Sequence, residues 1–260
     1  MALFTISVRL ALSTIFDAVD DQVRDDFSKG FIRDENDYTS NLTSRVRNLI
    51  NSSLNLHATT HTQMLPKKVE EAWGVDACII FIDHANDLSK LCLFEAKSDG
   101  RWDRIQKKIG FRESHFSTQL DRQRKPFNMG FAIWEQFYSR KPCGSPIGRR
   151  NTRGSTCILH QEAILHNAPH PGGSVWNLGD IDLLAVKQGS TKMGDMILKA
   201  CECKIGTPKT LQELYSLIGY ILPAKHILVI QGGGKVISHE EYFNKKADLK
   251  NNIPIPGSCD

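Results

Sequence analysis

The sequence predicts an α/β protein, because apolar runs of strand length occur in pairs and a segment with helical spacing follows each pair. The two strand pairs are residues 77–82 with 90–97, and residues 182–186 with 196–204. The chain has 260 residues, of which 40% are hydrophobic and 24% are charged. This is an ordinary composition for a globular protein, and the length suffices for one large domain or two small ones.

The elements of the first half follow from local patterns. The apolar start of the chain, interrupted by Arg9, predicts a helix or strand that packs on the domain rather than a signal peptide. Residues 36–56 predict a helix, capped by Asn36 or Asp37, because its apolar residues recur at helical spacing. The strands at 77–82 and 90–97 are joined by the turn-like DHANDLS, and a helical pattern returns over residues 113–138 with a break near Pro126.

The second half repeats this alternation after a segment rich in Pro, Gly and Arg. Besides the second strand pair, we expect strands at 156–165 and 226–230 and a helix from Thr207-Pro208 to about residue 222. The predicted division of the chain is therefore a first region, a linker or long loop, and a second α/β region. Their bounds are residues 1–140, 141–154 and 155–260.

Basic residues are concentrated in the middle of a mildly basic chain, whose net charge is +4. These basic residues form two clusters in the sequence, which favours a protein surface that binds along a phosphate backbone. The residues expected to contact nucleic acid are Arg101, Arg104, Lys107, Lys108, Arg122 and Arg124. A second basic run extends from Arg140 to Arg153.

The cysteine pattern and hydropathy indicate the compartment. The seven cysteines form no CxxC pair, and several lie in apolar runs, which favours the reducing cytoplasm. No run reaches the roughly 18 apolar residues of a membrane span, so no membrane partner is expected.

Two acidic residues and a lysine occupy positions where a strand hairpin would bring them together. Asp76 opens the first strand, and Glu95 and Lys97 lie two residues apart on the second. Residues i and i+2 of a strand point to the same face, so Glu95 and Lys97 share a face, and pairing of the strands would place Asp76 beside Glu95. Such carboxylates suit Mg²⁺ or Mn²⁺, which can activate water for phosphodiester hydrolysis, while the lysine holds the phosphate.

The segment GVDACIIFIDHANDLSKLCLFEAK resembles the catalytic hairpin of the PD-(D/E)xK, or restriction-endonuclease-like, superfamily. The resemblance implies a mixed central sheet flanked by helices. It further implies that Asp76 and Glu95 bind the metal and that Lys97 contacts the scissile phosphate or the attacking water. Glu71, or else Glu70, would be the supporting acid from an upstream helix, and Gln119 in SHFSTQLDRQ the supporting glutamine. Val75 stands where the family often has proline.

The same pattern recurs downstream as a second candidate site formed by Asp182, Glu202 and Lys204. Three interpretations stay open: an internal duplication, a second hairpin that is the true site, or ordinary strand composition in one larger domain. We rank the first site ahead because the basic cluster and the glutamine-bearing segment follow it directly.

The sequence thus predicts a metal-dependent endonuclease of restriction, phage-defence or recombination type that acts on DNA. RNA stays open as the substrate, and a homodimer stays open as the assembly. The alternative function is a catalytically inactive nucleic-acid-binding or assembly module with the same fold. Cys157, His160, His166 and His170 have zinc-like spacing, but we favour an interpretation as unrelated strand and surface residues.

Overall fold

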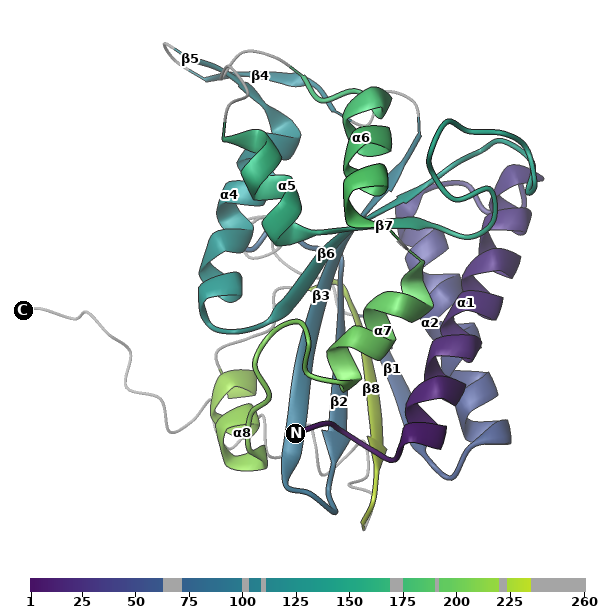
Figure 1. Cartoon of the computed structure of the whole chain (residues 1–260), viewed down its shortest axis with the longest axis vertical. Coiled ribbons are helices and arrows are strands. Elements are labelled where there is room, and N and C mark those ends of the chain that lie inside the picture. The colour runs from purple at the N-terminus through teal and green to yellow at the C-terminus, as the bar shows by residue number, and fades with distance from the viewer. Residues whose placement is uncertain are drawn as a thin grey trace, which may run out of the picture.

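The computed structural model describes residues 1–62, 72–99, 103–108, 111–168, 175–189, 192–219 and 224–234. Helices cover both faces of a central sheet (Figure 1). The helices are α1 (Ile6–Ser28), α2 (Glu35–Ser53), α4 (His115–Asn128), α5 (His160–Asn167), α6 (Leu178–Gln188), α7 (Met193–Cys201) and α8 (Leu211–Gly219). The strands are β1 (His57–Thr62), β2 (Ala77–Asp83), β3 (Leu88–Ser98), β4 (Ile105–Lys108), β5 (Phe111–Ser114), β6 (Ala132–Tyr138), β7 (Thr156–Leu159) and β8 (His226–Gly232).

The main sheet is mixed and has six strands in the order β1-β8-β2-β3-β6-β7. β2 and β3 form an antiparallel hairpin, whereas β8 runs parallel to β2 and β6 runs parallel to β3. The edge strands β1 and β7 are antiparallel to their neighbours. Strands β2, β6 and β8 are buried along their whole length, which is why apolar residues predominate in their sequences.

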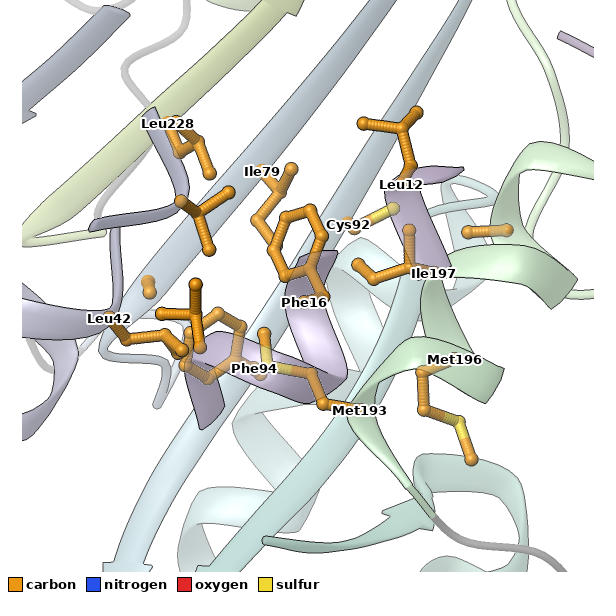
Figure 2. Packing of buried hydrophobic residues seen from close by; sticks show 14 of the residues in the cluster. Leu12, Phe16, Leu42, Ile79, Cys92, Phe94, Met193, Met196, Ile197 and Leu228 are labelled. Carbon is orange, nitrogen blue, oxygen red and sulfur yellow. The ribbon is translucent and has the colours of Figure 1, made fainter. Parts of the chain in front are cut away.

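Successive residues of β2 pack into different cores. Ala77, Ile79 and Phe81 face the core under α1, α2 and α7, where Phe16 and Ile197 also lie (Figure 2). The alternate residues of β2 face the opposite core, with Leu214 of α8. Residues from α4, α5 and α6 form a third cluster. The sheet is thus covered on both faces, and its strand ends are the places where functional side chains can reach solvent.

Several elements confirm the sequence-based expectations, with small shifts of their bounds. The expected helix over 36–56 is α2, but its cap is Asp34 and not Asn36 or Asp37, which lie in the first turn. The Asp34 carboxylate accepts from the Asp37 amide at 3.0 Å. The expected strands over 77–82, 90–97 and 226–230 are β2, β3 and β8. The apolar start of the chain forms α1. A mixed α/β architecture with a helix-flanked sheet is therefore established.

The predicted helix over 113–138 is wrong in its second half. α4 ends at Asn128, and Gly130 then adopts a φ of +85°, a left-handed conformation that terminates the helix. The remaining residues form β6. Similarly, the strand expected over 156–165 ends at Leu159 and continues as α5, and the helix expected from residue 207 begins at Leu211.

The second strand pair is also wrong, since its residues form helices α6 and α7. Asn177 and Asp180 make a capping box that starts α6. In α7, Met193, Met196 and Ile197 recur at helical spacing and are buried. The structure therefore has no second hairpin at these residues. β7 and β8, from the second predicted region, join the same sheet as β2 and β3 from the first.

Within the described ranges, no helix combines the length and apolar character that crossing a membrane requires.

Candidate active site

The β2–β3 hairpin brings Asp76 and Glu95 to adjacent positions. Ala77 is paired with Phe94, and the Asp76 amide donates to the Phe94 carbonyl at 3.0 Å, so Asp76 lies opposite Glu95. The carboxylate of Asp76 turns toward β3 and accepts from the Ala96 amide at 2.9 Å. Asp76 is partly exposed, whereas Glu95 is buried, so solvent reaches the pair from the side of Asp76.

The carboxylate of Glu95 is held by two neighbours. The Lys97 ammonium and the Gln119 side-chain amide both donate to Glu95 Oε1. Lys97 lies two residues along the same strand, and Gln119 comes from α4, whose first turn is capped by Ser114. The structure therefore brings together Asp76, Glu95, Lys97 and Gln119, the four described residues of the first predicted site.

The close approach of α4 to the hairpin depends on Gly74. This residue has a φ of +62°, and a Cβ atom built on it would lie 3.0 Å from the carbonyl oxygen of Gln119. Larger residues would push the helix away from the sheet. Gly74 thus lets Gln119 reach Glu95.

Glu35, which the sequence analysis did not select, is an acidic residue of an upstream helix that lies next to the candidate site. It lies in the first turn of α2, and its Oε1 accepts from the amide and the hydroxyl of Ser98 at 3.1 and 3.3 Å. Ser98 directly follows Lys97 on β3. The residues selected for this role, Glu71 and Glu70, lie outside the described residues.

Sequence reasoning missed Glu35 because its position has an ordinary explanation. An acidic residue in the first turn of a helix stabilises the helix dipole, and the expected helix was placed one residue later. The sequence feature that could have identified Glu35 is an acidic residue at a helix start upstream of the hairpin, but Asp37 has the same feature. Only the packing of the start of α2 beside the end of β3, where Glu35 contacts Ser98, distinguishes Glu35.

A second buried carboxylate, Glu135, lies behind Glu95. The two glutamates are direct partners across β3 and β6. Glu135 is bonded to His160 Nδ1 at 3.1 Å and accepts from Gln123 Nε2 at 3.2 Å. Gln123 also donates to the Gly74 carbonyl at 2.7 Å. This network ties α4 and α5 to the sheet beneath the candidate site.

Burial and charge change the acidity of the site residues. Desolvation by the surrounding protein, followed by the charge of Asp76, raises the pKa of Glu95 well above its ordinary value. Desolvation also raises the pKa of Asp76, opposed by Lys97. Burial alone would lower the pKa of Lys97, but Glu95 and Asp76 together raise it above its ordinary value. Lys97 is therefore a cation at neutral pH, and a second cation would favour the ionised carboxylates.

The side chains of the candidate site offer the oxygen ligands that Mg²⁺ prefers. Mg²⁺ in proteins takes one or two carboxylates and fills its remaining positions with water and substrate phosphate. Asp76 and Glu95 supply two, and the buried Gln119 Oε1 has no hydrogen-bond partner among the described residues, which leaves it available to a bound water. No group of three or more His, Cys, Asp or Glu side chains within the described ranges is arranged to hold a metal. A two-carboxylate site falls below that number.

The second candidate site is not assembled. Asp182, on α6, accepts from the Arg149 amide at 3.1 Å and from Arg150 Nε at 3.0 Å. Glu202 follows α7 and forms a surface ion pair with Lys204 at 2.7 Å. Because the predicted strands are helices, the hairpin that would have placed Asp182 beside Glu202 does not form.

The Cys and His residues with zinc-like spacing likewise have different partners. His160 is bonded to Glu135, and His166 Nε2 to Asp180 Oδ1 at 3.1 Å. Cys157 lies in the core under α1 and α7. His170 is outside the described residues.

Basic residues lie next to the candidate site at the start of α4. The carbonyl of Arg104, an exposed residue, accepts from the His115 amide at 2.8 Å. Desolvation, and then the charges of Lys97, Arg104 and Arg122, lower the pKa of His115, so these cations surround it. Arg124 is exposed but paired with Asp121 at 2.9 Å. Arg101 and the side chains of Lys107 and Lys108 lie outside the described part.

Comparisons with models of known protein families, with curated proteins and with solved structures found no significant match. A function for this chain therefore has to be argued from the residues of the site and their chemistry.

Proposed function

We propose that this protein is a metal-dependent nuclease of the PD-(D/E)xK type, with a restriction-endonuclease-like fold, that hydrolyses phosphodiester bonds in DNA. The observation that carries the proposal is the convergence of Asp76, Glu95 and Lys97 at one end of the β2–β3 hairpin, with Gln119 on Glu95. Two carboxylates and an ammonium, supplied by neighbouring strands, have the composition of a metal-assisted phosphodiesterase site.

Asp76 and Glu95 are the residues that would hold Mg²⁺ or Mn²⁺. When bound, the ion would offset the negative charge of the phosphate and lower the pKa of a coordinated water. Gln119 orients the Glu95 carboxylate, and Glu35 adds negative charge beside Asp76. Lys97, held as a cation by both carboxylates, can donate to an oxygen of the scissile phosphate.

Arg104 and Arg122 supply positive charge beside the site for the nucleic-acid backbone. Backbone contacts of this kind position a duplex without reading its sequence. We therefore expect tight binding to depend on salt and the cleavage chemistry to depend on the hairpin residues. Cleavage of RNA in place of DNA would change the substrate and leave this division of roles intact.

The chain carries its own matched control for a test of this proposal. Glu95 and Lys97 are buried in the hairpin, whereas Glu202 and Lys204 have the same spacing on the surface. We expect Glu95→Gln to reduce Mg²⁺- or Mn²⁺-dependent cleavage of DNA by a factor of at least about 100, the usual loss when a transition-state contact is removed. We expect Glu202→Gln to cleave like wild type.

Unchanged cleavage by Glu95→Gln, or equal losses in both variants, would remove the hairpin from the mechanism. Circular dichroism and thermal unfolding of both variants establish that they fold. Lys97→Ala and Lys204→Ala form a second pair with the same expected contrast.

The alternative function is a catalytically inactive module that binds nucleic acid or a partner protein. The observation that favours it is the internal pairing of the site, since Lys97 and Gln119 already satisfy Glu95 Oε1. Binding of DNA by the wild-type protein without cleavage in Mg²⁺ or Mn²⁺ would select this alternative.

A further inference from the structure

Tyr138 is held rigidly at the end of β6, next to the candidate site. Its partner across the sheet is Ser98, which also binds Glu35. The Tyr138 ring stacks on Tyr38 with centroids 3.9 Å apart and meets the edge of Phe27 at 5.0 Å. Only 2% of Tyr138 is exposed. The ring therefore has one orientation, and its hydroxyl has one position.

The hydroxyl of Tyr138 is buried and has no hydrogen-bond partner among the described residues. Buried tyrosine hydroxyls usually have a partner, because a buried polar group that loses its water without gaining a hydrogen bond destabilises the fold. The stacked neighbour follows the rule, since the Tyr38 hydroxyl donates to Asp20 Oδ1 at 2.7 Å. An isolated donor in so constrained a place indicates a water or ion that completes the site.

The surroundings of this hydroxyl are acidic. Burial raises the pKa of Tyr138 most, followed by the negative charges of Glu35 and Asp76, with smaller effects from Asp34 and Glu95. The phenol therefore stays protonated and is able to donate a hydrogen bond beside the carboxylates of the candidate site. A neutral phenol is a poor ligand for Mg²⁺, which prefers charged oxygens and retains several of its waters.

We propose that the Tyr138 hydroxyl donates a hydrogen bond to a water carried by the divalent cation that Asp76 and Glu95 bind. Tyr138 is then a positioning residue of the cation site and contacts neither the metal nor the substrate directly. This inference rests on the proposed function. It adds a residue that the pattern of acidic residues and lysine does not contain, and it explains why an isolated hydroxyl is kept beside the carboxylates.

The test is Tyr138→Phe in the full-length protein, with Mn²⁺ as the probe. Phenylalanine keeps the stack on Tyr38 and the contact with Phe27 while removing only the hydroxyl. We expect Mn²⁺ affinity, measured by isothermal titration calorimetry, to fall by about 10-fold or more, the usual loss when a partner of a metal-bound group is removed. We expect the thermal unfolding temperature without metal to be unchanged or slightly higher.

Tyr38→Phe is the matched control, because it removes a hydroxyl that is already hydrogen-bonded. We expect the opposite pattern in this variant, with a lower unfolding temperature and wild-type Mn²⁺ affinity. Wild-type affinity in Tyr138→Phe would overturn the role of Tyr138 and leave the cation site standing. A metal-free loss of stability in Tyr138→Phe as large as that in Tyr38→Phe would also overturn it, in favour of a structural role.

The wild-type titration separates this inference from the proposed function. Absence of Mn²⁺ binding by the wild-type protein would overturn both. Binding by wild type that Glu95→Gln abolishes and Tyr138→Phe weakens is the expected result.

Discussion

Glu95 and Glu202 each lie two residues before a lysine, but their carboxylates are affected in opposite directions. Desolvation raises the pKa of buried Glu95 well above its ordinary value, whereas a hydrogen bond from Lys204 lowers the pKa of Glu202, which is partly exposed. A surface ion pair such as that between Glu202 and Lys204 contributes little to stability, because water already solvates both charges. At the scale of single residues, burial distinguishes a candidate metal ligand from an ordinary surface glutamate.

Asp20 shows the same principle away from the candidate site. It lies on the buried face of α1 and accepts from Tyr38 Oη and Ser155 Oγ, both at 2.7 Å, and from the Ser155 amide. Burial, opposed by these hydrogen bonds, raises its pKa from 3.8 to about 6. The folded protein therefore binds a proton at Asp20 more tightly than the unfolded chain does.

This difference predicts a pH dependence of stability. Below pH 3.8 Asp20 is protonated in both the folded and the unfolded state, and its contribution to the free energy of unfolding is fully present. This contribution is lost as the pH rises through about 6. The loss amounts to roughly 3 kcal/mol, at about 1.4 kcal/mol for each pH unit. Denaturant unfolding of wild type and Asp20→Asn between these pH values measures it. We expect the stability difference between the two proteins to change with pH in that range.

Other buried acidic residues affect the free energy of unfolding equally in wild type and in Asp20→Asn, so their effects cancel in the difference between the two proteins. A constant difference between the wild-type and Asp20→Asn curves would contradict the prediction.

At the scale of elements, the sequence predicted those strands whose surroundings agree with their composition. β2 and β8 are apolar on both faces because they lie inside the sheet, and both were predicted. α6 and α7 were predicted as strands because short apolar runs suit either structure. The helical spacing of Met193, Met196, Ile197 and Ala200 was the signal that could have decided α7.

The candidate site was predictable to the extent that it is local in the chain. Asp76, Glu95 and Lys97 lie on one hairpin, and Gln119 lies on the helix that follows it. Glu35 and Tyr138 lie beside Ser98, next to the site, and come from α2 and from the end of β6. Their approach depends on how distant elements pack, which no local pattern in the sequence records.

The loop after α7 packs closely against the start of β6 at a glycine, and the effect of replacing this glycine can be predicted. Gly206 has a φ of +63°, and a Cβ atom there would lie 2.6 Å from the Ala132 amide nitrogen and 2.9 Å from the Gly130 oxygen. Gly206→Ala should therefore lower the free energy of unfolding through both backbone strain and overpacking. Denaturant unfolding measures the change.

Gly144→Ala is the control for strain alone. Gly144 also has a positive φ, of +87°, but no described atom lies within 4 Å of a Cβ atom built there. We expect Gly206→Ala to be less stable than Gly144→Ala by about 1–3 kcal/mol, the usual effect of overpacking. Equal losses would show that the loop after α7 moves aside.

At the scale of the whole molecule, one sheet combines segments that lie far apart in the chain. β8 enters between β1 and β2, so the candidate site stands on a sheet whose centre is completed late in the sequence. The net charge of +4 is modest, and the location of cations therefore matters more than their sum. Arg104 and Arg122 lie beside the candidate site, whereas Lys204 lines a pocket with Phe127 and Gly130 at the other end of α4.

This arrangement predicts how DNA affinity responds to salt. Each arginine or lysine that neutralises a phosphate releases counterions, so the logarithm of the affinity falls with the logarithm of salt concentration by about 0.9 for each contact. We expect Arg104→Ala to reduce that slope by about 1, measured by fluorescence anisotropy with a labelled duplex in EDTA, which prevents cleavage.

Lys204→Ala removes the same charge from the chain and serves as the control. If the net charge alone governed binding, both variants would lose affinity equally at low salt, and their slopes would agree. If the cations around His115 form the nucleic-acid surface, only Arg104→Ala changes the slope, because Arg104 is one of these cations and Lys204 is not. Identical slopes in wild type and Arg104→Ala would therefore separate the basic surface from the candidate active site, and the backbone would have to approach the hairpin from another side.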